Sequence, residues 1–163
     1  MDHARIEKTA WLSPCGRYRH ALGRHWDRAA GFALFIGVNP STADAEQDDP
    51  TIRRCVRFAK DWGYGGLEMC NLFDWRATDP AKLPRKGFAV SDYNDPTLRV
   101  RVSEAAVVIA AWGAVPWAQP RIDEIQRTVF AEEPRWHCLG LTKQGYPRHP
   151  LYVPAKAVPV LFW

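Results

Sequence analysis

The sequence has no long apolar segment. No apolar run reaches the roughly 20 residues that a membrane-spanning helix needs, and the opening residues, MDHARIEKTA, lack the apolar stretch of a signal peptide. Cysteine is scarce as well. The four cysteines lie far apart and form no C-x-x-C pair, so neither a zinc knuckle nor a disulfide framework is indicated. We therefore expect a cytoplasmic protein with reduced thiols.

Glycine-rich nucleotide-binding motifs are also missing. The chain contains no G-x-x-x-x-G-K phosphate loop, no G-x-G-x-x-G dinucleotide motif and no G-x-S-x-G elbow of a hydrolase. One acidic cluster, Asp44, Glu46, Asp48 and Asp49, has side chains that would suit a divalent cation. A solvated acidic loop that ends in a helix cap is the better interpretation, and we expect neither a metal nor a cofactor.

The residues that are present fit one folded domain. A chain of 163 residues, 47% apolar and 25% charged, is long enough for a single core. Its eight tryptophans are many for this length, and we expect some of them to line a site. We therefore treat residues 1–163 as one domain and expect a monomer.

One helix between two apolar strands organises the first half of the chain. Residues 32–38 form an almost continuous apolar run, typical of a strand buried on both faces. Asp49 and Pro50 supply an N-cap and a first-turn proline, and apolar residues then recur at helical spacing up to Gly63. A second strand is predicted over 67–72. This order implies a right-handed parallel crossover.

The remaining segments complete an expected α/β fold, a mostly parallel sheet of about four strands with helices on both faces. Residues 11–27 predict a β-hairpin that covers a sheet edge. Residues 78–96, rich in Pro and Asp, predict a long surface loop. Further along we expect a strand over 105–112, a helix over 120–131 and a strand over 136–141. One face of the hairpin would carry Tyr18, His20, Leu22, Arg24 and Trp26.

The carboxyl ends of the predicted strands carry side chains with useful chemistry. Open parallel sheets bind ligands at this edge, and here the strands lead into residues 37–41, Asn71, Trp112 and His149. Asn39 can hold a water, Asn71 can read a cyclic amide, and a neutral His149 can donate to an oxygen that gains negative charge. Each also has a simpler interpretation: Asn39 as part of a turn, Asn71 as an asparagine that caps a loop, and His149 as an isolated histidine without a function.

Positive side chains form two clusters, although the net charge is only +4. One cluster lies in the predicted hairpin and the other in the helix that follows Asp49. A solvated face is the simpler interpretation of such clusters, and a polyanion-binding surface is the functional one. The residues are Arg17, Arg19, Arg24, Arg28, Arg53, Arg54, Arg57 and Lys60.

Nearly the whole chain resembles a bacterial and phage family known as domain of unknown function 1643. Five segments carry the resemblance in order: SPCGRYRHALGRHW, FIGVNPSTADAEQDDPTIRRC, GYGGLEMCNLF, VVIAAWG and LGLTKQGYPRHPLYV. Membership of this family implies no particular activity.

A shorter pattern resembles the uracil-DNA glycosylase superfamily. It consists of glycine-x-Asn-Pro after a first strand, Asn after a second, an apolar strand ending in glycine, and then His-Pro. The resemblance implies a three-layer α/β/α fold in which Asn39 positions the attacking water, Asn71 reads the base and His149 stabilises the leaving base. It also implies that Phe73 or Trp75 stacks on the base. The chain departs from many members after His-Pro, where Leu-Tyr replaces a serine-rich segment that contacts the DNA backbone.

The expected site therefore has three parts. Its catalytic residues are Asn39 and His149. Contacts to a nucleic-acid backbone are expected from Arg17, Arg19, Arg24, Arg53 and Arg148. Substrate binding is assigned to Gly37, Val38, Pro40, Ser41, Asn71, Phe73, Trp75, Trp112 and Pro150.

Cleavage of an N-glycosidic bond needs a positioned water, stabilisation of the departing base anion and a pocket for a flipped base. The expected function is that of a DNA glycosylase for a modified base, with DNA as the partner. Two alternatives stay open: an N-glycosidase for free nucleosides or nucleotides, and a non-catalytic binder of nucleic acid or nucleotides. Because Asn39 cannot accept a proton as a carboxylate can, Asp44, Asp48 or Asp49 could activate the water.

Overall fold

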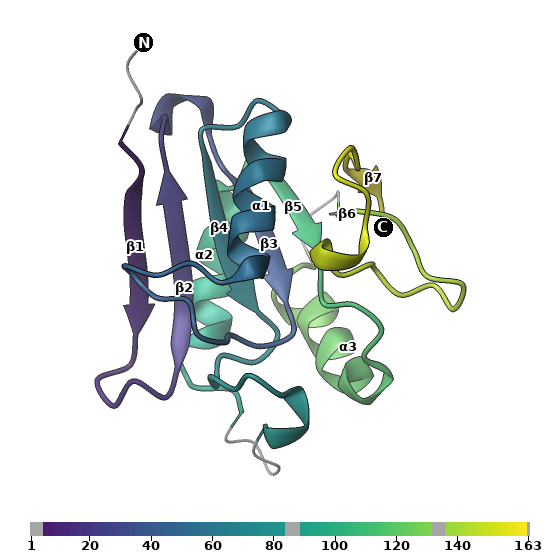
Figure 1. Cartoon of the computed structure of the whole chain (residues 1–163). Helices are drawn as coiled ribbons and strands as arrows, with labels where there is room; N and C mark the ends of the chain where they lie inside the picture. The colour runs from purple at the N-terminus through teal and green to yellow at the C-terminus, as the bar shows by residue number, and fades with distance from the viewer. Residues whose placement is uncertain (1–4, 84–88, 132–135, 163) are drawn as a thin grey trace.

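The structure is a computed structural model that describes residues 5–83, 89–131 and 136–162. It is a mixed α/β protein with a seven-stranded sheet and, within these ranges, three α-helices (Figure 1). The helices are α1 (Pro50–Asp61), α2 (Asn94–Glu104) and α3 (Gln119–Thr128). The strands are β1 (Glu7–Leu12), β2 (Arg19–His25), β3 (Ala33–Gly37), β4 (Gly66–Asn71), β5 (Val107–Ala110), β6 (His137–Cys138) and β7 (Val160–Leu161).

The centre of the sheet is parallel and its edges are antiparallel. Along the sheet the order is β1-β2-β4-β3-β5-β6-β7, and the four inner strands pair in parallel. These four are the strands that the sequence predicts. The expected total of about four is too low, because the hairpin pairs with β4 through Leu22 and Met69 and because β7 joins the opposite edge. The sheet is therefore mixed rather than mostly parallel.

Apolar clusters cover both faces of the sheet. On one face, α1 packs Ile52 and its neighbours against strand residues that include Phe35. On the other face, Leu98 of α2 and Ile122 of α3 pack in a cluster with Ile36. Successive β3 residues thus face opposite clusters, as the pleat of a strand requires. The almost continuous apolar run of β3 follows from burial on both sides.

Helix α1 begins where the sequence predicts, whereas α2 was not predicted. The Asp49 carboxylate caps α1 by accepting a hydrogen bond from the backbone N–H of Ile52 at 2.8 Å. Helix α2 begins in the stretch 78–96, which was expected to be a loop and of which 84–88 lie outside the described residues. Its central sequence, LRVRV, alternates like a strand, so its helical form depends on tertiary packing. No helix within the described ranges has the length and apolar composition to cross a membrane.

Strand β2 contains a bulge at His20. Ala21 and Arg19 pair with consecutive residues of β1, so His20 is an extra residue on its strand. The bulge interrupts the predicted alternation along the hairpin. The His20 ring lies 2.8 Å from the Asp74 carboxylate, whereas Leu22 joins the apolar cluster beneath α1. The expected common face therefore holds for Leu22, Arg24 and Trp26, on the α1 side of the sheet, and is wrong for His20.

Candidate functional site at the carboxyl edge of the sheet

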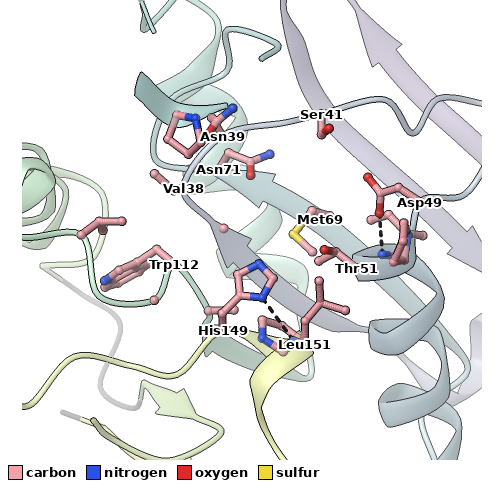
Figure 2. Close-up of a pocket in the computed structure, with 18 of the residues that line it drawn as sticks. Val38, Asn39, Ser41, Asp49, Thr51, Met69, Asn71, Trp112, His149 and Leu151 are labelled. Atoms are coloured by element: carbon pink, nitrogen blue, oxygen red, sulfur yellow. Dashed lines mark hydrogen bonds between the residues drawn. The ribbon is translucent and has the colours of Figure 1, made fainter. Parts of the chain in front are cut away.

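One cavity of about 770 Å³ lies at the carboxyl ends of β3, β4 and β5. Asn39 follows β3, Asn71 ends β4, Trp112 follows β5 and His149 comes from the segment after β6 (Figure 2). Pockets of roughly 300–1,000 Å³ enclose a whole small-molecule ligand. The strand ends thus meet at one site, as the sequence predicts. The expected binding residues that line it are Gly37, Val38, Ser41, Asn71, Trp112 and Pro150.

The Asn71 amide is buried at the cavity wall. Its side chain is 3% exposed, and Nδ2 has no hydrogen-bond partner among the residues that the structure describes. Parallel pairing places Gly37 directly beside it. A Cβ atom at position 37 would come within 2.9 Å of Asn71 Oδ1, so glycine leaves the space that this amide occupies.

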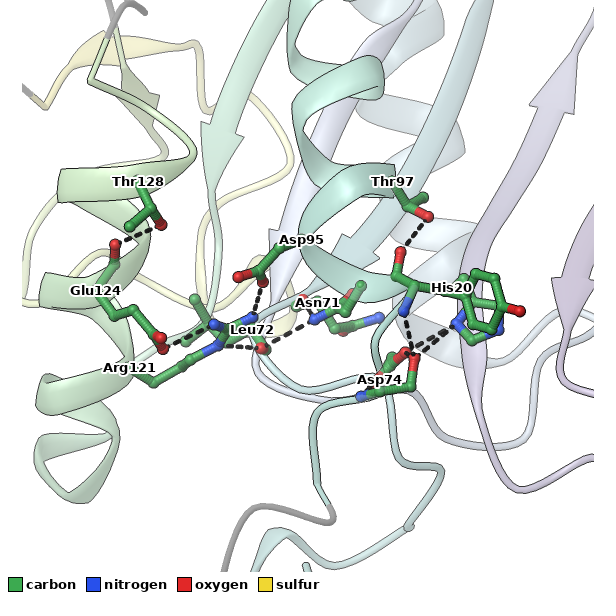
Figure 3. A network of polar contacts seen from close by, with 12 residues as sticks. His20, Asn71, Leu72, Asp74, Asp95, Thr97, Arg121, Glu124 and Thr128 are labelled. Carbon is green, nitrogen blue, oxygen red and sulfur yellow. Dashed lines mark hydrogen bonds and ion pairs between the residues drawn. The ribbon is translucent and has the colours of Figure 1, made fainter.

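A polar network from α2 and α3 binds the backbone carbonyls at and after Asn71 (Figure 3). Asn94 Nδ2 donates to the carbonyls of Asn71 and Leu72, both at 3.1 Å. Arg121 Nε donates to the Leu72 carbonyl at 2.8 Å, and its guanidinium also pairs with Asp95 at 2.5 Å. Sequence reasoning missed this network, because its members come from α2 and α3 and share no motif or spacing.

Asn39 holds the loop after β3 and keeps an acceptor. Its Nδ2 donates to the carbonyl of Ala77 at 2.7 Å and to that of Pro40 at 3.1 Å. Pro40 itself is buried in this loop, whereas Asn39 lines the cavity. Both donor bonds therefore orient the amide, and Oδ1 is the atom that can accept a hydrogen bond from water or ligand. These bonds agree with the simple turn interpretation, whereas the functional interpretation of Asn39 stays a prediction.

His149 is held in one neutral tautomer. Its Nδ1 accepts a hydrogen bond from the backbone N–H of Leu151 at 3.2 Å, which places the proton on Nε2. Burial lowers the pKa of His149, and the charge of Asp49 only partly opposes this effect. The imidazole is therefore a neutral N–H donor at pH 7. Figure 2 shows the ring on the side of the cavity opposite Asn71.

Of the three candidate carboxylates, Asp49 lines the cavity. The Asp44 carboxylate instead accepts hydrogen bonds from two backbone N–H groups, which lie two and three residues further along the chain. These hydrogen bonds lower the pKa of Asp44. Asp48 pairs with Arg24 at 2.8 Å. The predicted part of a carboxylate in activating the water stays a prediction, and Asp49 is the candidate of the three that the cavity includes. Within the described part of the chain, no three His, Cys, Asp or Glu side chains are grouped so that they could hold a metal ion.

Two expected aromatic contacts lie elsewhere. The Phe73 ring stacks on Trp117 with centroids 5.7 Å apart and packs against the cluster beneath α2 and α3. Trp75 meets Tyr18 edge-on at 5.3 Å and lines a second, smaller hollow beside Arg17. Neither Phe73 nor Trp75 lines the cavity, so neither is placed to stack on its ligand. Trp112 is the expected aromatic residue that lines the cavity.

The five arginines expected at a nucleic-acid backbone have different environments. Arg17 and Arg53 are exposed, and Arg148 is exposed at the cavity rim. Arg19 also lines the cavity but is only 2% exposed. Arg24 is fully buried and donates to the carboxylate and carbonyls of the acidic loop before α1. The expected role of Arg24 is therefore wrong, because a phosphate cannot reach its guanidinium.

The fold and cavity define an α/β protein with a ligand-sized site at the carboxyl edge of its parallel strands. The chain belongs to the family described as "Protein of unknown function (DUF1643)", whose model matches residues 19–151. No curated protein and no solved structure matches the chain. The family match extends from β2 to the segment after His149, so it includes every strand end that forms the cavity.

Proposed function

We propose that the chain is a base-excising N-glycosylase on a three-layer fold like that of uracil-DNA glycosylases. The observation that carries the proposal is the Asn71 amide, whose buried Nδ2 lies at the cavity without a described partner. Leaving a buried donor without a partner is costly, so the site favours a ligand that supplies an acceptor. A ring carbonyl of a flipped base is such an acceptor.

His149 suits the stabilisation of a departing base. Breaking the N-glycosidic bond leaves negative charge on the base, and a preorganised donor lowers the energy of that state. The neutral Nε2–H that follows from the Leu151 contact is such a donor. It faces the cavity from the side opposite Asn71, so one ring could contact both residues (Figure 2).

A water molecule would attack the sugar carbon from the Asn39 side of the cavity. Asn39 Oδ1 would orient the water, because Nδ2 is bound to two carbonyls. An amide cannot take the proton that this water loses, whereas the Asp49 carboxylate can. We therefore assign positioning to Asn39 and proton acceptance to Asp49, whose Oδ1 also caps α1.

The proposal is tested with a panel of single- and double-stranded oligonucleotides that contain modified bases. Alkali treatment and gel analysis detect abasic sites, and mass spectrometry detects the released base. The double variant Asn39→Ala and His149→Ala, purified in parallel, controls for contaminating glycosylases. We expect base release by the wild type from at least one substrate and at least 100-fold less by the double variant. No release from any substrate would contradict the proposal.

An N-glycosidase for free nucleotides is the second candidate. The burial of Arg19 and Arg24 favours it, because two of the five arginines expected along a polymer are then missing from the surface. Binding to a polymer through the exposed Arg17, Arg53 and Arg148 should weaken steeply as salt rises. Salt-independent binding, or release of base from free nucleotides alone, would select the second candidate.

A further inference from the structure

Arg19 is a charged group in the cavity that the proposed chemistry does not use. It begins β2, next to the bulge at His20, and bulges beside binding sites commonly re-aim a side chain. Its Nη1 donates to the carbonyl of Ala43 at 2.9 Å, which anchors the guanidinium beneath the loop that leads to α1. The side chain is 2% exposed and lines the same cavity as Asn71.

The guanidinium is incompletely bonded. An arginine side chain has five N–H donors, and the Nε donor of Arg19 is buried without a partner among the described residues. Burial lowers the pKa of Arg19 to about 10, so the group keeps its charge at neutral pH. Asp49 supplies the strongest attraction to it, but Oδ1 of Asp49 is committed to the cap of α1.

Arg24, on the same strand, is a buried arginine whose charge and N–H donors are matched by protein partners. It is equally buried, and its Nε pairs with the Asp48 carboxylate at 2.8 Å. Its Nη1 donates to the Gly23 carbonyl at 2.8 Å and its Nη2 to the Asp44 carbonyl at 2.5 Å. Buried charges need such partners. Arg19 lacks this set and faces a cavity, so the missing counter-charge is one that a ligand can bring.

The position of Arg19 fits a group that is attached to a bound base. β2 pairs with β4, and the backbone N–H of Arg19 donates to the carbonyl of Asp74, three residues after Asn71. The first turn of α1, with Thr51 at the cavity wall, adds the positive end of a helix dipole. A cavity of about 770 Å³ also has room for more than a base alone.

We propose that the Arg19 end of the cavity binds a phosphate group of the ligand. The ligand class is then nucleoside phosphates, either free nucleotides or nucleotides within a strand, and not uncharged nucleosides or bases. A guanidinium matches the oxygens of a phosphate with paired donors. The proposal relies on the proposed function for the presence of a base, whereas the charge of the ligand follows from Arg19 itself.

Calorimetric binding of matched pairs tests the proposal without any turnover. The probes are deoxyuridine with its 5′-monophosphate, and the corresponding pairs of thymidine, deoxycytidine and deoxyadenosine. For at least one pair the phosphate should tighten binding at least tenfold, and Arg19→Gln should remove that difference. Arg57→Gln, at an exposed position of α1 outside the cavity, should retain it. Equal binding of both members of every pair by the wild type would overturn the proposal.

A second measurement on the wild type covers the case in which Arg19→Gln does not fold. The side-chain Nε–H signal of Arg19 in a nitrogen-15 NMR spectrum should shift when inorganic phosphate or a nucleoside monophosphate is added. A dinucleoside monophosphate, which has a phosphodiester and no terminal phosphate, distinguishes a strand from a free nucleotide as the source. Shifts with either kind of phosphate support the site, and no shift with any of these probes overturns it. Because neither measurement needs base release, failure of the glycosylase assay leaves this test intact.

Discussion

Gly37→Ala would place a methyl group against the amide of Asn71, the side chain that we propose reads the ligand. The new Cβ would lie 2.9 Å from Asn71 Oδ1, whereas ordinary contact begins at 3.4 Å, so the amide must move by about 0.5 Å. The next neighbour, Met69 Sδ, lies at 3.7 Å and needs no movement. Overpacking of this kind should cost about 1–2 kcal/mol of unfolding free energy. For a domain of this size, that lowers Tm by roughly 2–8 °C.

The cause of that cost can be isolated in a double-mutant cycle with Asn71→Ala. Removing the amide removes the atom that the new methyl group meets, so Gly37→Ala should cost less than about 0.5 kcal/mol in the Asn71→Ala background. Urea unfolding of the four proteins, followed by tryptophan fluorescence, measures the cycle. If Gly37→Ala costs the same in both backgrounds, the close contact between Gly37 and Asn71 is refuted.

Three further predictions concern the groups around the cavity. Arg121→Ala should lower the free energy of unfolding by about 1–3 kcal/mol, since it removes one of the two donors to the buried Leu72 carbonyl and the ion-pair partner of Asp95, whereas Arg127→Ala should change it by less than about 0.5 kcal/mol in the same urea assay. Asn71→Ala should keep binding to oligonucleotides but lose selection among bases, because stacking alone discriminates poorly; competition binding measures this. Because burial lowers the pKa of His149 below its ordinary value of 6.5, the unfolded chain takes up a proton first as pH falls. The wild type should therefore lose more stability than His149→Gln between about pH 7 and pH 5, and equal losses would show that the imidazole is not held neutral.

The sequence was most informative where structure depends on neighbouring residues along the chain. Asp49 and Pro50 mark the start of α1, because an N-cap and a first-turn proline act within one helical turn. The run at 32–38 marks β3 because a strand buried on both faces excludes polar residues. Parallel pairing of β3 with β4 then brings Gly37 and Asn71 together. The main elements of the cavity were therefore predictable without coordinates.

What could not be predicted depends on contacts between distant segments. The bulge at His20 is defined by the register of β1 against β2, which no pattern within β2 reveals. Asn94 and Arg121 support Asn71 from two different helices, one of which alternates like a strand in sequence. The exposure of an arginine likewise depends on the loop that covers it. The sequence predicts that Arg24 belongs to a basic surface, whereas in the structure the acidic loop before α1 encloses it.

The single-turnover rate of base release tests the central claim most directly. On a substrate identified in the oligonucleotide panel, Asn39→Ala, His149→Ala and Asp49→Asn should each slow the chemical step. For His149→Ala, which loses a transition-state donor, the expected decrease is on the order of 100-fold. Binding should be unchanged in all three, because their contacts matter chiefly in the transition state. Asp61→Asn, at the exposed end of α1, is the matched control and should keep the wild-type rate. Wild-type rates in both Asn39→Ala and His149→Ala would contradict a glycosylase mechanism at this cavity.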